Sequence, residues 1–119
     1  MGKAELFDIQ AVDWQMIGPN RTAVFQGAEN VTIQYWELPP GSSSKDMPHS
    51  HPYEQISCVL AGNCIFGVDG EEFEAGPGCM VYMPANAMHY GTTVGSQTAV
   101  CIDVFAPKRE DRPQSPARE

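Results

Sequence analysis

Short runs of apolar and β-branched residues alternate with turn-forming residues along most of this chain. The pattern predicts strands at residues 30–38, 55–60, 64–68, 71–74, 79–83 and 97–105. Between two of them, Asp69-Gly70 is a strong signal for a two-residue hairpin. Many short strands of this kind favour an all-β sandwich or barrel, and the middle of the chain shows no helical periodicity. Residues 4–16 fit either a short helix or an edge strand.

Length and charge narrow the range of functions. With 119 residues the chain is expected to form one domain. Its net charge of -8 argues against nucleic acid and against an anionic membrane surface as partners, because both attract a basic face. No apolar run is long enough to span a membrane and the first five residues do not resemble a signal peptide, so the cytoplasm is the expected compartment. The four cysteines lack C-x-x-C spacing and are expected to be reduced, buried thiols.

The three histidines of the chain fall in two stretches that suggest a metal site. His49 and His51 lie in His-Ser-His-Pro-Tyr-Glu-Gln, which ends at Gln55, and His89 follows Pro84 by five residues. Because alternate residues of a strand face the same side, His49, His51 and Gln55 can converge on one interior point. His89 could reach that point from a neighbouring strand. Imidazole binds zinc, nickel, manganese and iron, so the pattern indicates a divalent metal without identifying it.

The last predicted strand carries a second group of candidate residues. Asp103 and Phe105 share one face of it, so a carboxylate and an aromatic ring would point into the barrel if residues 101–105 line the interior. A buried carboxylate is costly unless it is paired or functional. Arg109 could hold a substrate carboxylate through its guanidinium. The alternatives are that Asp103 pairs with a nearby Lys or Arg or is a strand-end carboxylate in solvent, and that Arg109 is a solvated charge beside Glu110 and Asp111.

The two histidine stretches resemble the paired motifs of the cupin superfamily, whose members are small β-barrels of the jelly-roll type. The residues that carry this resemblance are His49, His51, Gln55 and Gly62 in the first motif and Gly78, Pro84 and His89 in the second. Two positions depart from the common pattern: Gln55 replaces the usual glutamate, and Thr93 stands where many cupins have asparagine. Three imidazoles and an amide are neutral, so a bound cation would keep its +2 charge and attract anionic oxygen ligands.

A narrower resemblance joins the first motif to the closing segment. His-x-His-Pro-x-Glu-Gln-Ile and Asp-Val-Phe-x-Pro-x-Arg-Glu-Asp, at residues 49–56 and 103–111, are similar to the KdgF family of pectin and alginate degradation. That family opens the ring of 4,5-unsaturated uronates to the linear keto acid. The resemblance implies a metal held by His49, His51, Gln55 and His89. It also implies catalytic roles for the residues that match Asp103 and Arg109, with Phe105 lining the site.

The resemblance covers residues 14–109, which we expect to form the barrel. Residues 1–13 are then an N-terminal arm, and residues 110–119, which are charged and carry two prolines, are expected to be a mobile tail. Small cupins often form dimers, so a homodimer is expected, with Ile56, Cys58 and Leu60 on an apolar face that a partner subunit would bury.

Two other functions stay open. One is a polyketide cyclase-like or dioxygenase cupin that acts on an aromatic substrate, and the other is a non-enzymatic, metal-dependent sensor of small molecules.

Overall fold

The computed structural model describes residues 2–118, so Met1 of the predicted arm and Glu119 of the predicted tail lie outside the described residues. The elements in chain order are a single 3-10 turn, η1 (Ile9–Ala11), and the strands β1 (Gln15–Ile17), β2 (Asn20–Phe25), β3 (Thr32–Leu38), β4 (Glu54–Ala61), β5 (Asn63–Val68), β6 (Glu71–Ala75), β7 (Met80–Met83), β8 (His89–Val94) and β9 (Ala99–Ala106). The prediction of an all-β fold is confirmed, and residues 4–16 contain both the short turn and the first edge strand.

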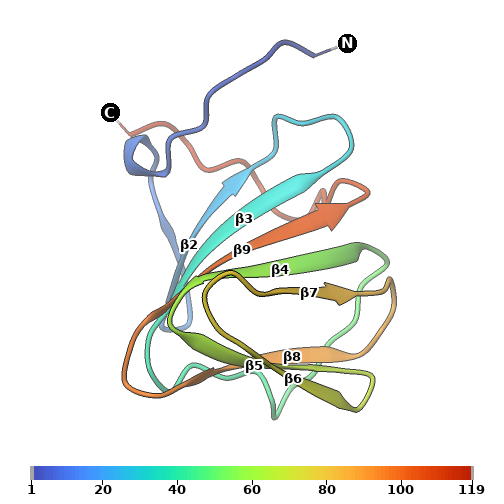
Figure 1. Cartoon of the computed structure of the whole chain (residues 1–119). Helices are drawn as coiled ribbons and strands as arrows, with labels where there is room; N and C mark the ends of the chain where they lie inside the picture. The colour runs from blue at the N-terminus through green and yellow to red at the C-terminus, as the bar shows by residue number, and fades with distance from the viewer. Residues whose placement is uncertain (1, 119) are drawn as a thin grey trace.

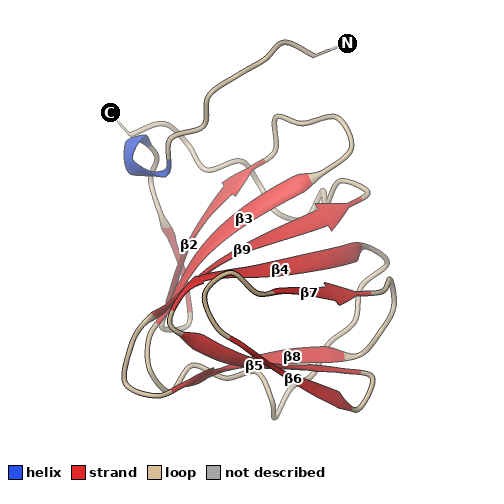
Figure 2. Cartoon of the chain, viewed as in Figure 1, coloured by secondary structure: helices blue, strands red, loops and turns tan. Residues whose placement is uncertain are grey.

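The strands form two antiparallel sheets that face each other (Figure 1). The larger sheet has the order β1-β2-β3-β9-β4-β7, and the smaller has the order β6-β5-β8. Figure 2 shows that loops join the sheets at both ends, and this arrangement is the predicted jelly-roll barrel. Strands distant in sequence therefore meet: β9 lies between β3 and β4 in the larger sheet, and its residues can face the barrel interior beside both.

The alternation of buried and exposed residues on β4 fixes which side chains enter the barrel. Gln55, Ser57 and Val59 are buried, whereas Glu54 and Ile56 are exposed. This agrees with the face assigned to Gln55 from the sequence. The core also contains apolar side chains from both sheets, so the buried face of each sheet is covered by the other: Cys64, Phe66, Val68, Ala75, Val81, Met83, Ala87, Ala99 and Cys101.

Gly62 makes the tight turn between β4 and β5. Its φ is +72°, a left-handed conformation that a side chain disfavours. A Cβ atom at this position would lie 2.8 Å from the Cα of Ala99. The turn therefore needs glycine both for its backbone conformation and for the close approach of β9.

Segments near both ends of the chain pack against the larger sheet, and in Figure 1 the η1 turn lies beside the C-terminal segment, whereas the N-terminus points away from it. Ser115 is buried, and it exchanges hydrogen bonds with the backbone of Val24 at 2.8 and 3.0 Å. The Arg118 amide donates to the Ala11 carbonyl at 2.8 Å, and Val12 forms a β-bridge with Ala117. Backbone groups of the C-terminal segment thus find partners on β2 and on the N-terminal arm through residue 118, and the mobility of this segment stays a prediction.

Several large apolar side chains lie exposed on the outer face of the larger sheet: Ile56, Leu60, Met80 and Tyr82. Ile56 and Leu60 are two of the residues expected to need cover, and the homodimer stays a prediction. Within residues 2–118, no helix has the length and hydropathy needed to cross a membrane.

Candidate metal and substrate site

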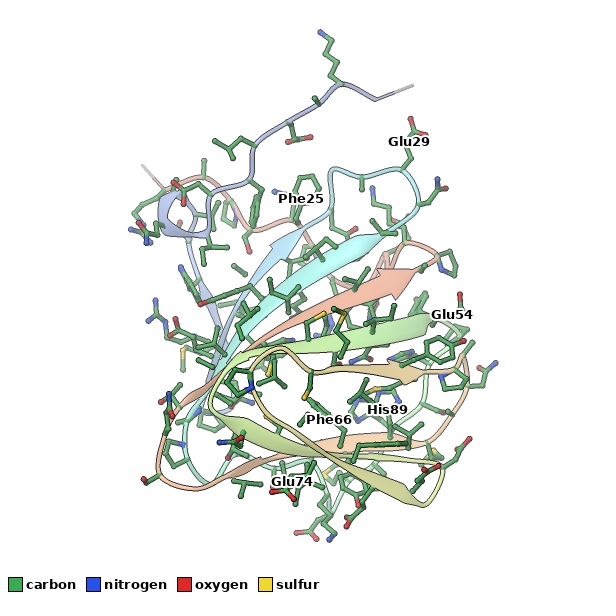
Figure 3. The ribbon with its side chains drawn as sticks, viewed as in Figure 1. Phe25, Glu29, Glu54, Phe66, Glu74 and His89 are labelled. Carbon is green, nitrogen blue, oxygen red and sulfur yellow. The ribbon has the colours of Figure 1, made fainter. Side chains whose placement is uncertain are left out.

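The three histidines meet at one end of the barrel. His49 pairs with His89, the first residue of β8, through backbone hydrogen bonds of 3.0 and 2.8 Å. The ring centroids lie 4.4 Å apart for His49 and His89, 4.7 Å for His51 and His89, and 6.3 Å for His49 and His51. His51 and His89 are buried, and His49 is exposed at the mouth. In Figure 3 His89 lies between the two sheets, on the same side as Phe66.

Backbone carbonyls orient the two buried rings. His89 Nδ1 lies 3.0 Å from the Ala87 carbonyl and His51 Nδ1 lies 3.1 Å from the Tyr53 carbonyl. A carbonyl only accepts, so each Nδ1 carries a proton, and the Nε2 of a ring that is neutral keeps a free lone pair. Burial lowers the pKa of His89 to about 4, so this ring is neutral near pH 7. Burial also lowers the pKa of His49.

One buried nitrogen of this cluster lacks a hydrogen-bond partner, and a second faces an oxygen atom that only accepts. His89 Nε2 is buried with no partner. His51 Nε2 lies 3.0 Å from Gln55 Oε1, and a neutral imidazole that donates through Nδ1 has no proton left for this contact. A cation bound by these nitrogen and oxygen atoms would satisfy all of them, so the donor set fits a divalent metal. Among the described residues, no group of three or more His, Cys, Asp or Glu side chains is already arranged to hold a metal.

A hydrogen-bonded chain connects the histidines to the predicted catalytic carboxylate. Gln55 Nε2 donates to Ser57 Oγ at 2.9 Å, and Ser57 Oγ donates to Asp103 Oδ1 at 2.6 Å. Ser57 and Asp103 are directly paired across β4 and β9. The amide of Gln55 is therefore fixed with its nitrogen towards Ser57 and its oxygen towards His51. Sequence analysis did not identify Ser57, although it shares the inward parity of Gln55.

Burial is the dominant influence on Asp103 and raises the pKa of its carboxyl group. Hydrogen bonds from the Ser57, Trp36 and Gln55 side chains and the positive charge of Arg109 act in the opposite direction. The carboxylate still faces open space, because Asp103 forms part of a cavity wall.

This cavity has a volume of about 280 Å³ and runs through the barrel between the two sheets. The polar residues at its histidine end are His49, Gln55, Ser57, His89, Asp103 and Arg112. Trp36, Phe66 and Met83 contribute apolar surface. On β3, Trp36 faces the cavity, whereas Tyr35 lies edge-on to Trp14 with ring centroids 5.2 Å apart.

The cavity wall, taken over the described residues, does not include Phe105 or Arg109. Phe105 is buried behind His51, with ring centroids 5.6 Å apart in an edge-to-face contact. The Arg109 guanidinium lies over Phe105 at 4.8 Å and over Tyr53 at 5.7 Å. Arg109 Nε donates to Asp111 Oδ1 at 3.0 Å. Arg112, which sequence analysis did not identify, faces the cavity instead.

Comparison with known proteins identifies the architecture. Residues 34–105 match the family model of the cupin domain, Cupin_2. The structure of KdgF from Halomonas sp. superposes with a TM-score of 0.81 and 24% sequence identity, covering 92% of this chain and 98% of that chain. An RmlC-like cupin from Shewanella frigidimarina superposes with a TM-score of 0.79 and 22% identity, covering 93% of this chain and 98% of that chain.

Similarity to curated sequences is more limited. The acireductone dioxygenase of Bacillus thuringiensis subsp. konkukian is 29% identical over 62 residues, which cover 48% of this chain and 36% of that protein. The acireductone dioxygenase of Bacillus anthracis shows the same identity and coverage. The chain spans about a third of the length of the curated relatives it matches.

Proposed function

The chain belongs to the cupin domain family, and we propose that it is a metal-dependent enzyme that opens the ring of 4,5-unsaturated uronates to the linear keto acid. The observation that carries this proposal is the chain of contacts from His51 through Gln55 and Ser57 to Asp103, which joins a neutral donor set to a carboxylate inside one cavity. The similarity in fold to KdgF supports it.

We propose that His49, His51, Gln55 and His89 hold the divalent metal. Two observations support this assignment: His89 Nε2 has no partner, and His51 Nε2 lies next to Gln55 Oε1, an atom that cannot donate a hydrogen bond. When bound, a divalent metal supplies Lewis acidity and attracts anionic oxygen atoms of a substrate. Because all four ligands are neutral, they leave its charge undiminished. Zinc, nickel, manganese and iron are all compatible with such ligands.

Asp103 is proposed to transfer protons. Ring opening removes the proton of the anomeric hydroxyl group, forms the C1 aldehyde as the C1–O5 ring bond breaks, and returns a proton to C4 of the enolate that is released. Among the described residues, Asp103 is the one carboxylate in the cavity wall, and Ser57 holds it in place. Phe105 supports the site from behind, because its ring packs against His51.

Arg109 is the guanidinium that the family resemblance assigns to the anionic end of the substrate. Its position over Phe105 and its positive charge near Asp103 support a role in the same site. Its hydrogen bond to Asp111 would have to open before Arg109 could bind a substrate. Arg109→Gln is therefore expected to lower ring-opening activity, and unchanged activity would remove this residue from the mechanism.

Proton NMR tests the proposed reaction directly. The metal-reconstituted protein is mixed with 4-deoxy-4,5-unsaturated galacturonate, and the vinyl proton signal is followed against a sample without enzyme. We expect faster loss of this signal, and we expect a chelator or Gln55→Ala to abolish the acceleration. An unchanged rate with metal verified in the protein would refute ring opening of this substrate. Loss of turnover in Asp103→Asn with the metal retained is the expected result for the proton-transfer role, and full activity would refute that role.

A metal-dependent dioxygenase is the second candidate, and the similarity to acireductone dioxygenases favours it. The three-histidine cluster is compatible with iron, and Trp36 in the cavity wall could stack on an aromatic substrate. Oxygen uptake by the iron-loaded protein with an acireductone or aromatic substrate would support this candidate. A polyketide cyclase-like activity is tested by cyclisation of such substrates without oxygen uptake, and a sensor by tight binding that leaves the ligand chemically unchanged.

A further inference from the structure

Arg112 lines the cavity and belongs to a segment held firmly to the barrel. Gln26 Nε2 donates to the carbonyl oxygens of Arg109, at 2.5 Å, and of Arg112. Gln26 is itself fixed, because Thr32 Oγ1 donates to its Oε1 at 2.8 Å. The Arg109 amide in turn donates to Thr32 Oγ1 at 2.7 Å. The backbone at Arg112 is thereby anchored to β3 independently of its side chain.

The side chain of Arg112 has hydrogen-bonding capacity that the protein does not use. It lines the same cavity as His49 and Asp103. Its Nε is buried and has no partner. Burial lowers the pKa of Arg112, with the charge of Arg109 acting in the same direction and Asp111 and Asp103 opposing it. An N–H of a charged group that is buried without an acceptor is costly, so a ligand that supplies an acceptor to Nε is favoured here.

The other three arginines of the chain are each paired with a carboxylate in the structure. Arg21 pairs with Glu37 at 3.2 Å, Arg109 with Asp111 at 3.0 Å and Arg118 with Asp13 at 3.9 Å. Arg112 differs because it lines a cavity and, among the described residues, forms no such ion pair. The planar fork of donors of a guanidinium matches the two oxygen atoms of a carboxylate.

We propose that Arg112 is the specificity-determining residue that binds the carboxylate of the ligand and gives the cavity its preference for sugar acids over neutral sugars. This assignment rests on the proposed function for the identity of the uronate, while its preference for a carboxylate follows from the cavity itself. Arg112 makes this contact from the cavity wall, and Arg109 joins it at the anionic end only when its hydrogen bond to Asp111 opens.

The test compares Arg112→Gln and Arg112→Lys with Arg118→Gln, which removes a guanidinium from the same C-terminal segment but outside the cavity. Calorimetry on the metal-loaded proteins measures binding of D-galacturonate and of the neutral sugar D-galactose, and ring opening of the unsaturated uronate gives KM and kcat. We expect Arg112→Gln to raise Kd for galacturonate and KM by about 10- to 100-fold, as for loss of a hydrogen bond to a charged group. Its kcat should change little, since the contact forms in the bound substrate as well. Arg112→Lys keeps the positive charge but lacks the planar pair of donors, so its Kd and KM should lie between those of the wild type and of Arg112→Gln.

The outcomes separate this inference from the proposed function. If wild-type protein opens the ring and Arg112→Gln matches Arg118→Gln within twofold in Kd and KM, the assignment of Arg112 fails and the proposed function stands. If no ring opening is found but Arg112→Gln alone loses galacturonate affinity, the assignment stands and the proposed reaction fails. Wild-type protein that binds no galacturonate, or binds galactose equally well, would overturn the assignment. Should Arg112→Gln fold poorly by its Tm, Arg112→Lys decides, because its expected loss is still several-fold.

Discussion

Replacing Ser57 by alanine tests the connection between the proposed metal ligands and the catalytic carboxylate. The substitution removes a single oxygen atom, which accepts from Gln55 Nε2 at 2.9 Å and donates to Asp103 Oδ1 at 2.6 Å. No other change is expected in the fold, because alanine occupies less volume and β4 keeps its pairing with β9. Gln55 then loses the contact that holds its Oε1 towards His51.

The expected magnitude follows from these two contacts. Groups that orient a metal ligand typically contribute about 10- to 100-fold to metal affinity, or roughly 1.4–2.8 kcal/mol. The hydrogen bond to Asp103 is charge-assisted, and its loss from a buried carboxylate costs about 1.5–3 kcal/mol of folding free energy. Ser57→Ala should therefore weaken metal binding by at least tenfold and also lower the free energy of unfolding.

Competition with a chromophoric chelator measures the metal affinity, and urea denaturation of the metal-free protein measures stability. Ser44→Ala is the matched control, because Ser44 also lines the cavity but its hydroxyl group bonds to the backbone of Gly91, away from Gln55. The reasoning would be refuted if Ser57→Ala and Ser44→Ala bound metal with affinities within twofold of each other.

Three further predictions concern the ligand set, the turn and the outer face. Gln55→Glu places a carboxylate beside the proposed cation and should raise its affinity at least tenfold in the same competition assay, and a lower affinity would argue against Gln55 as a ligand. Gly62→Ala should lower the free energy of unfolding, measured in urea, by about 1–3 kcal/mol, because the added Cβ meets Ala99 and the positive φ is strained for alanine. A loss below about 0.5 kcal/mol, which is the range of neutral surface substitutions, would contradict this. Leu60→Glu places a charge on the exposed apolar face and should convert a dimer to a monomer in sedimentation velocity, whereas an unchanged dimer would locate its interface elsewhere.

The parts of the fold that were predicted correctly are those with a local signal. On β4 the alternation of side chains is enough to put Gln55 inside and Ile56 outside, and on β9 it is enough to put Asp103 and Phe105 on one face. The β2 strand, by contrast, begins with polar residues, and the sequence pattern did not predict it. Its Thr22 is buried because Gln34 Nε2 donates to Thr22 Oγ1 at 2.8 Å, a pairing that exists only once β2 and β3 are adjacent.

Residues outside such patterns depend on contacts between distant parts of the chain. The segment after β9 reads as a charged tail because its composition carries no information about its partners. Its position is set by Gln26, which lies 86 residues before Arg112, and by Val24, which lies 91 residues before Ser115. The position of Arg112 at the cavity therefore cannot be predicted from periodicity or from motif spacing.

The charge of the site differs from that of the molecule, and this difference bears on the substrate. The chain carries a net charge of -8, which repels an anion at long range, although this repulsion is largely screened beyond about 8 Å at physiological ionic strength. Inside the cavity the proposed ligands are neutral, so a +2 cation and Arg112 together outweigh the one carboxylate of Asp103. Local charge in a poorly solvated cavity has more influence than distant surface charge. A compact anionic ligand is therefore favoured over a neutral one of the same size.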